Sequence, residues 1–323
     1  MGSLGAVILA DTVYRERLEE EIRARVPDVR FVYVGEAGEV RGDPSDAEIF
    51  FNWGLTSDVV EPVIRAAPAL RWFHHLSAGV DSLLFPALRD SGIVLTNARG
   101  VFAIPIAESV LAVMLYVAKN LRQNFADAAR RHWQRRPRQE LYGVTAGILG
   151  LGAIGCEVAR RLDAFGMRVI GLKRHPERAQ DVQVEALYGP GQLDDFLPQC
   201  DWVIVCAALT AASRALLGPR EFAAMKDDAW LVNVARGEIA DEAALLRALD
   251  EGRIGGACLD AFAQEPLPPE SPFWDHPRVV VTPHNASVSP RTEARSLALA
   301  LENFDRYLRG ETLRNVVDKQ AGY

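Results

Sequence analysis

Residues 147–155 read Gly-Ile-Leu-Gly-Leu-Gly-Ala-Ile-Gly and place the spacing G-x-G-x-x-G at Gly150, Gly152 and Gly155. The spacing alone is a weak signal, but an apolar strand candidate precedes it and a helical segment follows it directly. In such a unit Gly150 permits the tight turn, Gly152 lets the backbone approach a pyrophosphate, and Gly155 lets helix and strand pack closely. The stretch predicts a doubly wound α/β domain that binds a dinucleotide. The alternative is a glycine-rich turn without a ligand.

Two features next to this turn concern the phosphates of the dinucleotide. The amides of Ala153 and Ile154 would open the following helix, where the helix dipole favours negative charge. The next strand candidate, 168–172, should end beside the adenosine ribose, where an NAD-preferring site carries an acidic residue. This chain has Lys173 and Arg174 there, and both attract a 2′-phosphate. We therefore predict that NADP(H) is favoured over NAD(H), the alternative being a pair of solvated surface cations.

Working outward from the turn, short apolar segments alternate with helical ones over most of the chain. This alternation, with near-continuous apolar strands, predicts parallel sheets covered on both faces, in two doubly wound units. Apolar residues recur at helical spacing between 105 and 130, which predicts one long helix joining the units. The expected strands are 6–10, 30–34, 48–53, 71–76, 93–96, 146–149, 168–172, 202–206, 230–233, 257–260 and 279–282, and the other expected helices include 14–25, 59–66, 156–164 and 287–308.

Composition limits the class of protein. A chain of 323 residues can form two domains, and 49% hydrophobic with 24% charged residues is ordinary for a globular protein. The formal net charge of −7 argues against general nucleic-acid binding, and we expect the basic segment 130–138 to be a solvated or subunit-contact surface. The four cysteines form no C-x-x-C pair, so we expect reduced thiols and no metal. No signal core or membrane-length apolar stretch is seen, and we expect a cytoplasmic protein.

Three later segments, each directly after an expected strand, carry residues suited to chemistry. Because parallel strands of a doubly wound sheet end at the same edge, Arg236, Glu265 and His284 could converge on one crevice. Taken singly, each has a plain alternative as a surface charge or a loop histidine. The segments are Asn233-Val-Ala-Arg-Gly237, Asp260-Ala-Phe-Ala-Gln-Glu-Pro-Leu-Pro268 and Thr282-Pro-His-Asn-Ala-Ser287.

The glycine turn and these three segments, in this order, resemble the D-isomer-specific 2-hydroxyacid dehydrogenase family, in particular its glyoxylate/hydroxypyruvate reductases. Further motifs of the resemblance are Ser77-Ala-Gly-Val-Asp81, Thr96-Asn-Ala-Arg-Gly100 and Ile106-Ala-Glu108. The resemblance implies a Rossmann cofactor domain, residues 100–287, inserted into a flavodoxin-like substrate domain formed by residues 1–99 and 288–323.

The resemblance also implies roles for the three convergent residues. Arg236 would hold the substrate carboxylate and polarise the 2-keto oxygen with its fixed positive fork. His284 would give that oxygen a proton as a general acid. Glu265 would hydrogen-bond the imidazole and favour its charged form. Reduction of a keto acid should then be favoured at lower pH, and oxidation of the hydroxy acid at higher pH.

Other site residues follow from the same resemblance. In the first domain, the amides of Ala78 and Gly79, with Ser77, would bind the substrate carboxylate. Independently of the resemblance, Asn52, Trp53 and Leu55 end a first-domain strand, and we expect them to face the substrate side chain. Asp260 would accept a hydrogen bond from the nicotinamide carboxamide. Two positions depart from the expected pattern, Ala208 where the family often has proline and Asn285 where an apolar residue is expected. The remaining cofactor contacts implied are Cys206, Thr210, Val234 and Ala235.

We therefore predict an oxidoreductase that reduces a small 2-keto acid to a D-2-hydroxy acid with hydride from NAD(P)H. One alternative within the family is an enzyme of 3-phosphoglycerate. An alternative of another class is a dinucleotide-sensing corepressor with little turnover. A homodimer built on the long helix and the basic arm is expected by resemblance.

Overall fold

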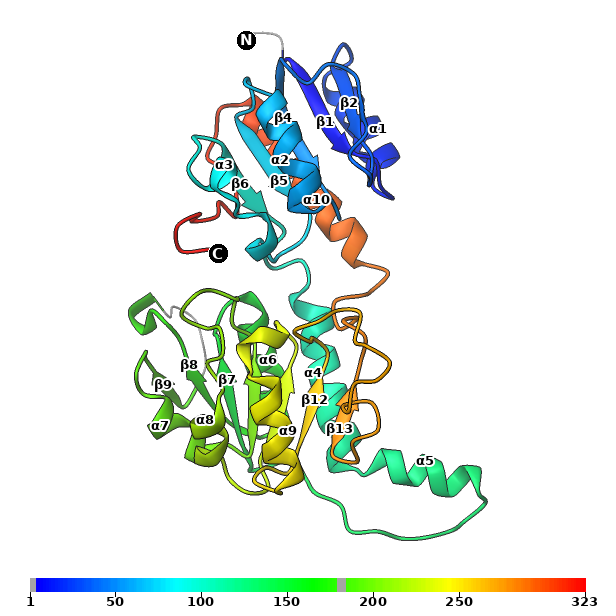
Figure 1. The fold of residues 1–323 in the computed structure, drawn as a ribbon, viewed down its shortest axis with the longest axis vertical. Helices are drawn as coiled ribbons and strands as arrows, with labels where there is room; N and C mark the ends of the chain where they lie inside the picture. The colour runs from blue at the N-terminus through cyan, green and yellow to red at the C-terminus, as the bar shows by residue number, and fades with distance from the viewer. Residues whose placement is uncertain (1–3, 179–183) are drawn as a thin grey trace. The chain divides into compact units, whose positions relative to one another are not determined.

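The computed structural model describes residues 4–178 and 184–323. The chain forms two compact units, which we call unit 1 (Met1–Phe102 with Ser289–Tyr323) and unit 2 (Ala103–Val288) (Figure 1). The boundaries predicted from the sequence lie after residues 99 and 287. Each unit is an α/β sheet with helices on both faces, which confirms the predicted fold class.

The sheet of unit 1 has the order β3-β2-β1-β4-β5-β6, and its strands are parallel except for β3 at the edge. Without β3, this is the flavodoxin-like order. All five residues of β1 are buried because side chains on both faces enter a core: Ile8 packs with α2 and Leu9 with the C-terminal helix α10. The strands are β1 (Ala6–Ala10), β2 (Arg30–Val34), β3 (Val40–Arg41), β4 (Ala47–Asn52), β5 (Trp72–His75) and β6 (Val94–Asn97), and the helices are α1 (Arg15–Arg25), α2 (Ser57–Ala66), α3 (Pro86–Arg89) and α10 (Thr292–Leu308).

The sheet of unit 2 is wholly parallel, in the order β13-β12-β11-β10-β7-β8-β9. Strand order reverses between β7 and β10, and ligands of such sheets bind at this reversal, beyond the carboxyl ends of the strands. The strands are β7 (Thr145–Leu149), β8 (Arg168–Leu172), β9 (Ala186–Tyr188), β10 (Trp202–Val205), β11 (Trp230–Asn233), β12 (Gly256–Leu259) and β13 (Val279–Val281), and the helices are α4 (Ala103–Ala118), α5 (Leu121–Ala129), α6 (Ala153–Ala164), α7 (Leu193–Phe196), α8 (Pro219–Ala224) and α9 (Glu242–Asp250).

The prediction of one long helix from 105 to 130 is wrong. The segment forms α4 and α5, with a bend of 65° between them. Asn120 lies in the left-handed region with φ 50°, which asparagine tolerates better than most residues, and the Asn124 side chain donates to the Lys119 carbonyl at 3.0 Å. Polar groups at the junction thus end the first helix. In the described part of the chain no single helix is long and apolar enough to cross a membrane, although α4 and α5 pass that test as a bent pair.

The C-terminal helix begins later than predicted, at Thr292 and not at Ser287. Pro290 disfavours helical backbone in the residue before it, so the helix can form only beyond the proline. Its apolar face, with Leu297, Leu301 and Phe304, then covers the β1–β4–β5 part of the sheet. Helix α10 therefore belongs to unit 1 although it follows unit 2 in the chain.

His74, the last residue but one of β5, is fully buried against Phe51, which in turn packs on Phe304 of α10. Thr96 Oγ1 accepts from Trp72 Nε1 at 2.8 Å and lies 2.7 Å from His74 Nδ1. The Thr96 hydroxyl keeps one proton and one lone pair for His74 Nδ1, so it can bond to a neutral imidazole in either tautomer, and Nε2 has no partner among the described residues. Burial, with a smaller contribution from His75, lowers the pKa of His74 to about 3.

This buried imidazole predicts a loss of stability in mild acid. In the unfolded chain the pKa of His74 is about 6.5, so below this pH the unfolded chain binds a proton that the folded chain does not bind. The free energy of unfolding therefore falls by about 1.4 kcal/mol per pH unit until the pH reaches the pKa of His74 in the folded chain. Between pH 7.5 and 5 we expect wild type to lose about 2 kcal/mol more than His74→Gln in urea unfolding. Carboxylates contribute equally to both proteins, so equal losses would contradict a neutral buried His74.

Candidate active site

The glycine turn between β7 and α6 has the geometry that its sequence predicts. Gly150 has φ +101°, and a Cβ there would lie 2.7 Å from the backbone N and Cα of Ala207. A Cβ on Gly155 would lie 2.1 Å from the Gly150 carbonyl oxygen. The Gly150 amide donates to Leu172 O at 2.9 Å, which ties the turn to β8. Both glycines are therefore required by the protein itself, whether or not a ligand is bound.

Gly152 differs from its two neighbours because the protein does not need it to be glycine. Its φ is −89°, it is exposed, and a Cβ built on it meets nothing within 4 Å. It is the N-cap of α6, and no side chain caps the amides that follow at Ala153 and Ile154. The open space above this helix N-terminus fits the pyrophosphate of a dinucleotide.

Two cations follow β8 at the ribose end of this site. The Lys173 amide donates to Tyr188 O at 2.9 Å, which continues the pairing of β8 with β9. Arg174 is exposed, and its Nη2 donates to Thr210 Oγ1 at 2.9 Å. Lys173 and Arg174 stand where an NAD-preferring site has its acid, so the residues present fit a phosphorylated ribose.

His284 and Glu265 meet at the carboxyl edge of the same sheet. Glu265, in the loop after β12, has Oε2 2.7 Å from His284 Nδ1, while its Oε1 accepts from the Phe262 amide at 2.9 Å. The imidazole side chain is 42% exposed and the carboxylate 36%, so both can reach a ligand. Because the carboxylate accepts, Nδ1 carries a proton and Nε2 is the nitrogen available to a substrate.

Arg236 stands on a turn at the end of β11 and is half-buried. Its Nη1 donates to Ala235 O at 2.9 Å. Asn233, which is 1% exposed, donates to Arg236 O at 2.9 Å and accepts from the Ala235 amide at 3.1 Å, so one buried amide fixes the turn. A Cβ on Gly237 would lie 2.0 Å from the Phe262 backbone, which shows that this turn packs against the loop carrying Glu265.

Asp260 has a structural task that the sequence analysis does not assign to it. Only 4% exposed, its carboxylate accepts from Thr282 Oγ1 at 2.5 Å and from the amides of Asn285 and Ala286 at 3.1 and 3.0 Å. These bonds hold the loop in which His284 adopts φ +49°. Asp260 thus positions the loop that carries His284, and one oxygen lone pair is left for the predicted carboxamide contact.

A small hollow lies beside Asp260 in unit 2, with a volume of about 180 Å³. Residues of α4 form one wall, and Ser109 Oγ donates to Ala286 O at 3.2 Å across its edge. The predicted contact residue Val234 also lines it, and its apolar walls suit the flat face of a nicotinamide ring. The wall from α4 was not predicted, because Ser109, Ala112 and Val113 lie in a segment whose spacing indicates only a helix. The lining residues are Ser109, Ala112, Val113, Val232, Val234, Cys258, Asp260, Thr282, Asn285 and Ala286.

The predicted substrate-binding residues lie in unit 1, at the carboxyl ends of β4 and β5. Ser77 O accepts from the Ala98 amide at 2.9 Å and Ala78 O from Asn97 Nδ2 at 2.7 Å, so the carbonyls of the Ser77–Gly79 turn are held in place. Trp53 is half-buried and meets Tyr14 edge to face, with ring centroids 4.6 Å apart. Their contacts with substrate stay predictions.

The thiols are poor candidates for chemistry. All four cysteines are free. Burial raises the pKa of Cys206, which follows β10 beside the glycine turn, to about 12, and burial does the same for Cys200 and Cys258. Among residues 4–178 and 184–323, no group of three or more histidine, cysteine, aspartate or glutamate side chains is placed to hold a metal ion.

Comparison with known proteins agrees with this geometry. Residues 111–286 match the family described as "D-isomer specific 2-hydroxyacid dehydrogenase, NAD binding domain". Glyoxylate/hydroxypyruvate reductase B of Pectobacterium carotovorum is 32% identical over 95% of this chain and 97% of that protein. D-3-phosphoglycerate dehydrogenase of Methanocaldococcus jannaschii is 34% identical over 80% of this chain, which spans only 50% of that protein.

Two similar solved structures hold a phosphorylated nicotinamide dinucleotide. A D-isomer specific 2-hydroxyacid dehydrogenase from Xanthobacter autotrophicus Py2, in complex with NADPH and MES, has a TM-score of 0.87, 29% identity and complete coverage of both chains. The NADPH-dependent glyoxylate/hydroxypyruvate reductase of Sinorhizobium meliloti, in complex with NADP and sulfate, has a TM-score of 0.83 and 29% identity, covering 99% of this chain and 100% of that one.

Proposed function

The chain belongs to the D-isomer specific 2-hydroxyacid dehydrogenase family, and we propose that it reduces glyoxylate to its achiral hydroxy acid and hydroxypyruvate to its D-hydroxy acid, preferring NADPH to NADH. It is an NAD(P)-dependent oxidoreductase that interconverts the CH–OH group of a 2-hydroxy acid and the carbonyl group of a 2-keto acid. The bond between His284 and Glu265 carries the proposal, because it supplies an oriented acid on the unit that has the dinucleotide turn. A corepressor that only senses the cofactor needs no such pair.

In the proposed reaction, Arg236 binds and polarises the substrate, and His284 with Glu265 supplies the proton. Bound reduced nicotinamide supplies the hydride that reaches the keto carbon. Arg236 holds the substrate carboxylate and draws electron density toward the keto oxygen. His284 gives that oxygen a proton from Nε2, and Glu265 stabilises the imidazolium before the transfer. Since reduction consumes this proton and oxidation releases it, the equilibrium between keto acid and hydroxy acid should move toward the keto acid as pH rises.

A panel of keto acids with both reduced cofactors tests the proposal. We expect loss of the reduced nicotinamide absorbance with glyoxylate and hydroxypyruvate, and kcat/KM about tenfold or more higher with NADPH than NADH, since two cations face the ribose phosphate. Replacing both Lys173 and Arg174 with Ala should remove this preference. Phosphohydroxypyruvate in the panel separates the 3-phosphoglycerate alternative. Tight NADPH binding without turnover of any short keto acid would favour the corepressor.

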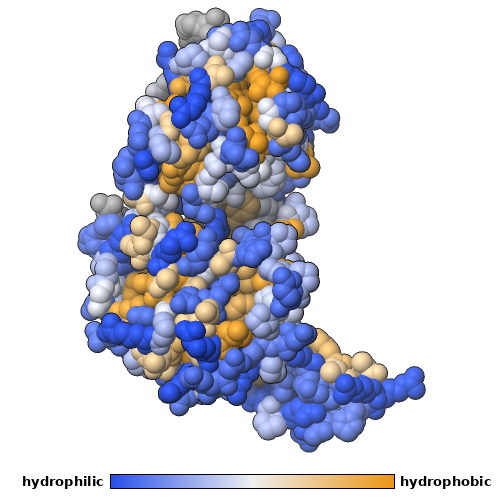
Figure 2. Space-filling model, viewed as in Figure 1, coloured by the Kyte–Doolittle hydropathy of each residue, from blue (hydrophilic) through white to orange (hydrophobic). Residues whose placement is uncertain are grey.

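We also propose that the protein is a homodimer that pairs through an arm formed by α5 and residues 130–138. In Figure 1, α5 extends away from the sheet of unit 2. Phe125 is 62% exposed and Trp133 is 94% exposed on this arm, and Figure 2 shows apolar residues there beside strongly hydrophilic ones. Exposed aromatic side chains of this size are typical of protein interfaces.

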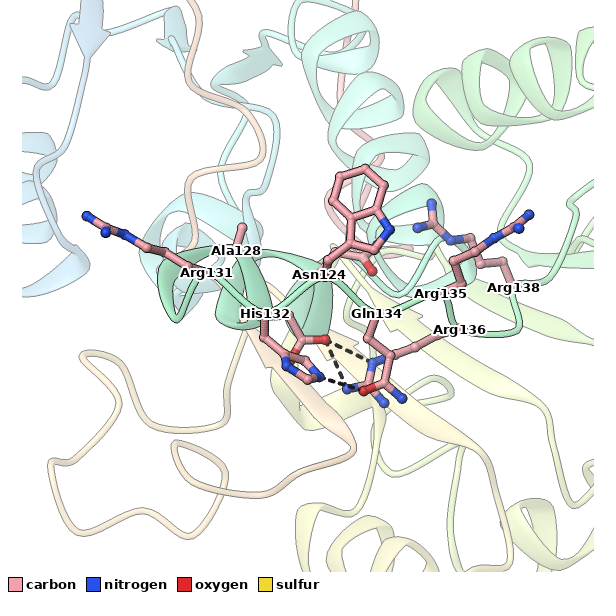
Figure 3. Close-up of a pocket in the computed structure, with 10 residues that line it drawn as sticks. Asn124, Ala128, Arg131, His132, Gln134, Arg135, Arg136 and Arg138 are labelled. Carbon is pink, nitrogen blue, oxygen red and sulfur yellow. Dashed lines mark hydrogen bonds and ion pairs between the residues drawn. The ribbon is translucent and has the colours of Figure 1, made fainter.

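Residues of the arm line a wide, open hollow of about 840 Å³, and Figure 3 shows these residues. Asp127 accepts from Gln123 Nε2 at 2.9 Å and from Arg136 Nε at 3.0 Å, and these bonds fold residues 130–138 back along α5. The hollow is lined by Asn124, Asp127, Ala128, Arg131, His132, Trp133, Gln134, Arg135, Arg136 and Arg138. Such a hollow beside two exposed aromatic rings suits a partner chain better than a small ligand.

Light scattering coupled to gel filtration tests the dimer. We expect wild type to elute with the mass of two chains and the double variant Phe125→Glu with Trp133→Glu to elute as a monomer, because two charges would be buried unpaired. Val40→Glu, at an exposed edge strand in unit 1, is the control and should leave the mass unchanged. If wild type is a monomer, or if the double variant is still a dimer, the chain does not dimerise through this arm.

A further inference from the structure

Two loops lie on either side of the glycine turn. In the sheet, β8 and β10 are the two neighbours of β7, and each continues into a loop at its carboxyl end. The Gly150 amide donates to Leu172 O, and the Cys206 amide donates to Leu149 O at 2.8 Å. The loop after β8 carries Arg174, and the loop after β10 carries Thr210. A bond between these two residues therefore spans the width of β7, at the adenosine end of the dinucleotide site.

Thr210 is itself firmly held. Its amide donates to Ser213 Oγ at 2.8 Å, and Ser213 Oγ donates to Ala208 O at 2.7 Å. Ser213 is only 8% exposed, and its amide donates back to Thr210 O at 3.1 Å. The Thr210 hydroxyl thus stands at a fixed point on a closed turn, and the bond of 2.9 Å from Arg174 Nη2 ends on that point.

We propose that Thr210 is a positioning residue that selects NADPH over NADH by holding the guanidinium of Arg174 toward the ribose 2′-phosphate. This inference rests on the proposed NADPH preference. An exposed arginine that moves freely loses rotamer entropy when it binds an anion. The bond to Thr210 already restricts the Arg174 side chain, so part of this entropy loss is made before the cofactor binds, and the bond uses only one of the five N–H donors of the guanidinium.

A different role for Thr210 makes a different prediction. If its hydroxyl touched the part of the dinucleotide that NADPH and NADH share, its loss would weaken both cofactors equally. If it acts through Arg174, its loss weakens only NADPH, and it has no effect once Arg174 is gone. The two roles are separated by binding measurements, without any turnover.

The experiment measures dissociation constants of NADPH and NADH by fluorescence titration of the full-length protein. For Thr210→Val, which keeps the shape of the side chain, we expect NADPH to bind about fivefold more weakly and NADH to change by less than about twofold. Thr210→Ser should restore NADPH binding. In the Arg174→Ala background, Thr210→Val should cause no further loss of NADPH affinity, which is the signature of coupled residues.

The outcomes of this experiment separate the positioning role of Thr210 from the NADPH preference itself. A wild type that binds NADPH no better than NADH refutes the NADPH preference. If wild type prefers NADPH, equal weakening of both cofactors by Thr210→Val, or additive losses in the double variant, overturns the positioning role alone. Arg214→Gln is the matched control, since this neighbouring arginine is exposed and pairs with Glu238 at 3.9 Å, and it should leave both affinities unchanged.

Discussion

The His284→Gln enzyme is expected to reduce glyoxylate about 10²- to 10⁴-fold more slowly than wild type in kcat/KM, the usual contribution of a general acid. Glutamine keeps a polar side chain of similar length but has no proton that it can release to the keto oxygen. Glu265 would then face an amide and lose the cation it stabilises. Steady-state kinetics at saturating NADPH measure the effect.

The loss should concern chemistry and not the cofactor. The dissociation constant of NADPH should stay within about twofold of wild type, because the imidazole belongs to the substrate side of the site. Glu265→Gln should cause a smaller loss, since the acid remains but is less well oriented. His276→Gln is the control: this loop histidine accepts from the Arg278 amide at 3.1 Å and should not affect turnover. A His284→Gln enzyme with wild-type activity would remove His284 from the mechanism.

The second large effect is expected from the glycine turn, where two substitutions of the same kind should behave differently. Gly152→Ala adds a Cβ into open space at a φ of −89°, so the free energy of unfolding should not change. If the pyrophosphate fills that space, the methyl group collides with it, and NADPH and NADH should both bind about 10- to 100-fold more weakly, as for an overpacked contact of about 1–3 kcal/mol.

Gly155→Ala is the matched variant, because it adds the same methyl group at a position where the protein itself leaves no room. Its Cβ would lie 2.1 Å from Gly150 O, so the helix must move from the strand and the protein should lose stability even without ligand. Chemical unfolding and cofactor titration of both variants give the two readouts. Unchanged cofactor affinity in a stable Gly152→Ala protein would mean that the dinucleotide does not lie over this turn.

Much of unit 2 could be predicted from the sequence because its signals are local. Strands β8 and β11 have the predicted bounds, since apolar runs of this length between polar loops allow few alternatives. The G-x-G-x-x-G spacing predicted the tight turn at Gly150 and the close helix–strand contact at Gly155, because backbone conformation and steric contact act within a few residues. The break at Asn120 was missed because a run with helical periodicity shows no internal proline or glycine, and only the left-handed backbone of Asn120 ends the helix.

The sequence by itself determined the two-sheet architecture, the dinucleotide turn, and the residue types able to carry a proton and hold a carboxylate. Only the tertiary structure decided how these groups are held. The 2.7 Å contact between His284 and Glu265, the grip of Asp260 on the His284 loop, and the bond from Arg174 to Thr210 join residues on different strand ends. Periodicity and spacing report what neighbours in the chain do. Hydrogen bonds between loops depend on strand order, and strand order is set by the packing of the whole unit.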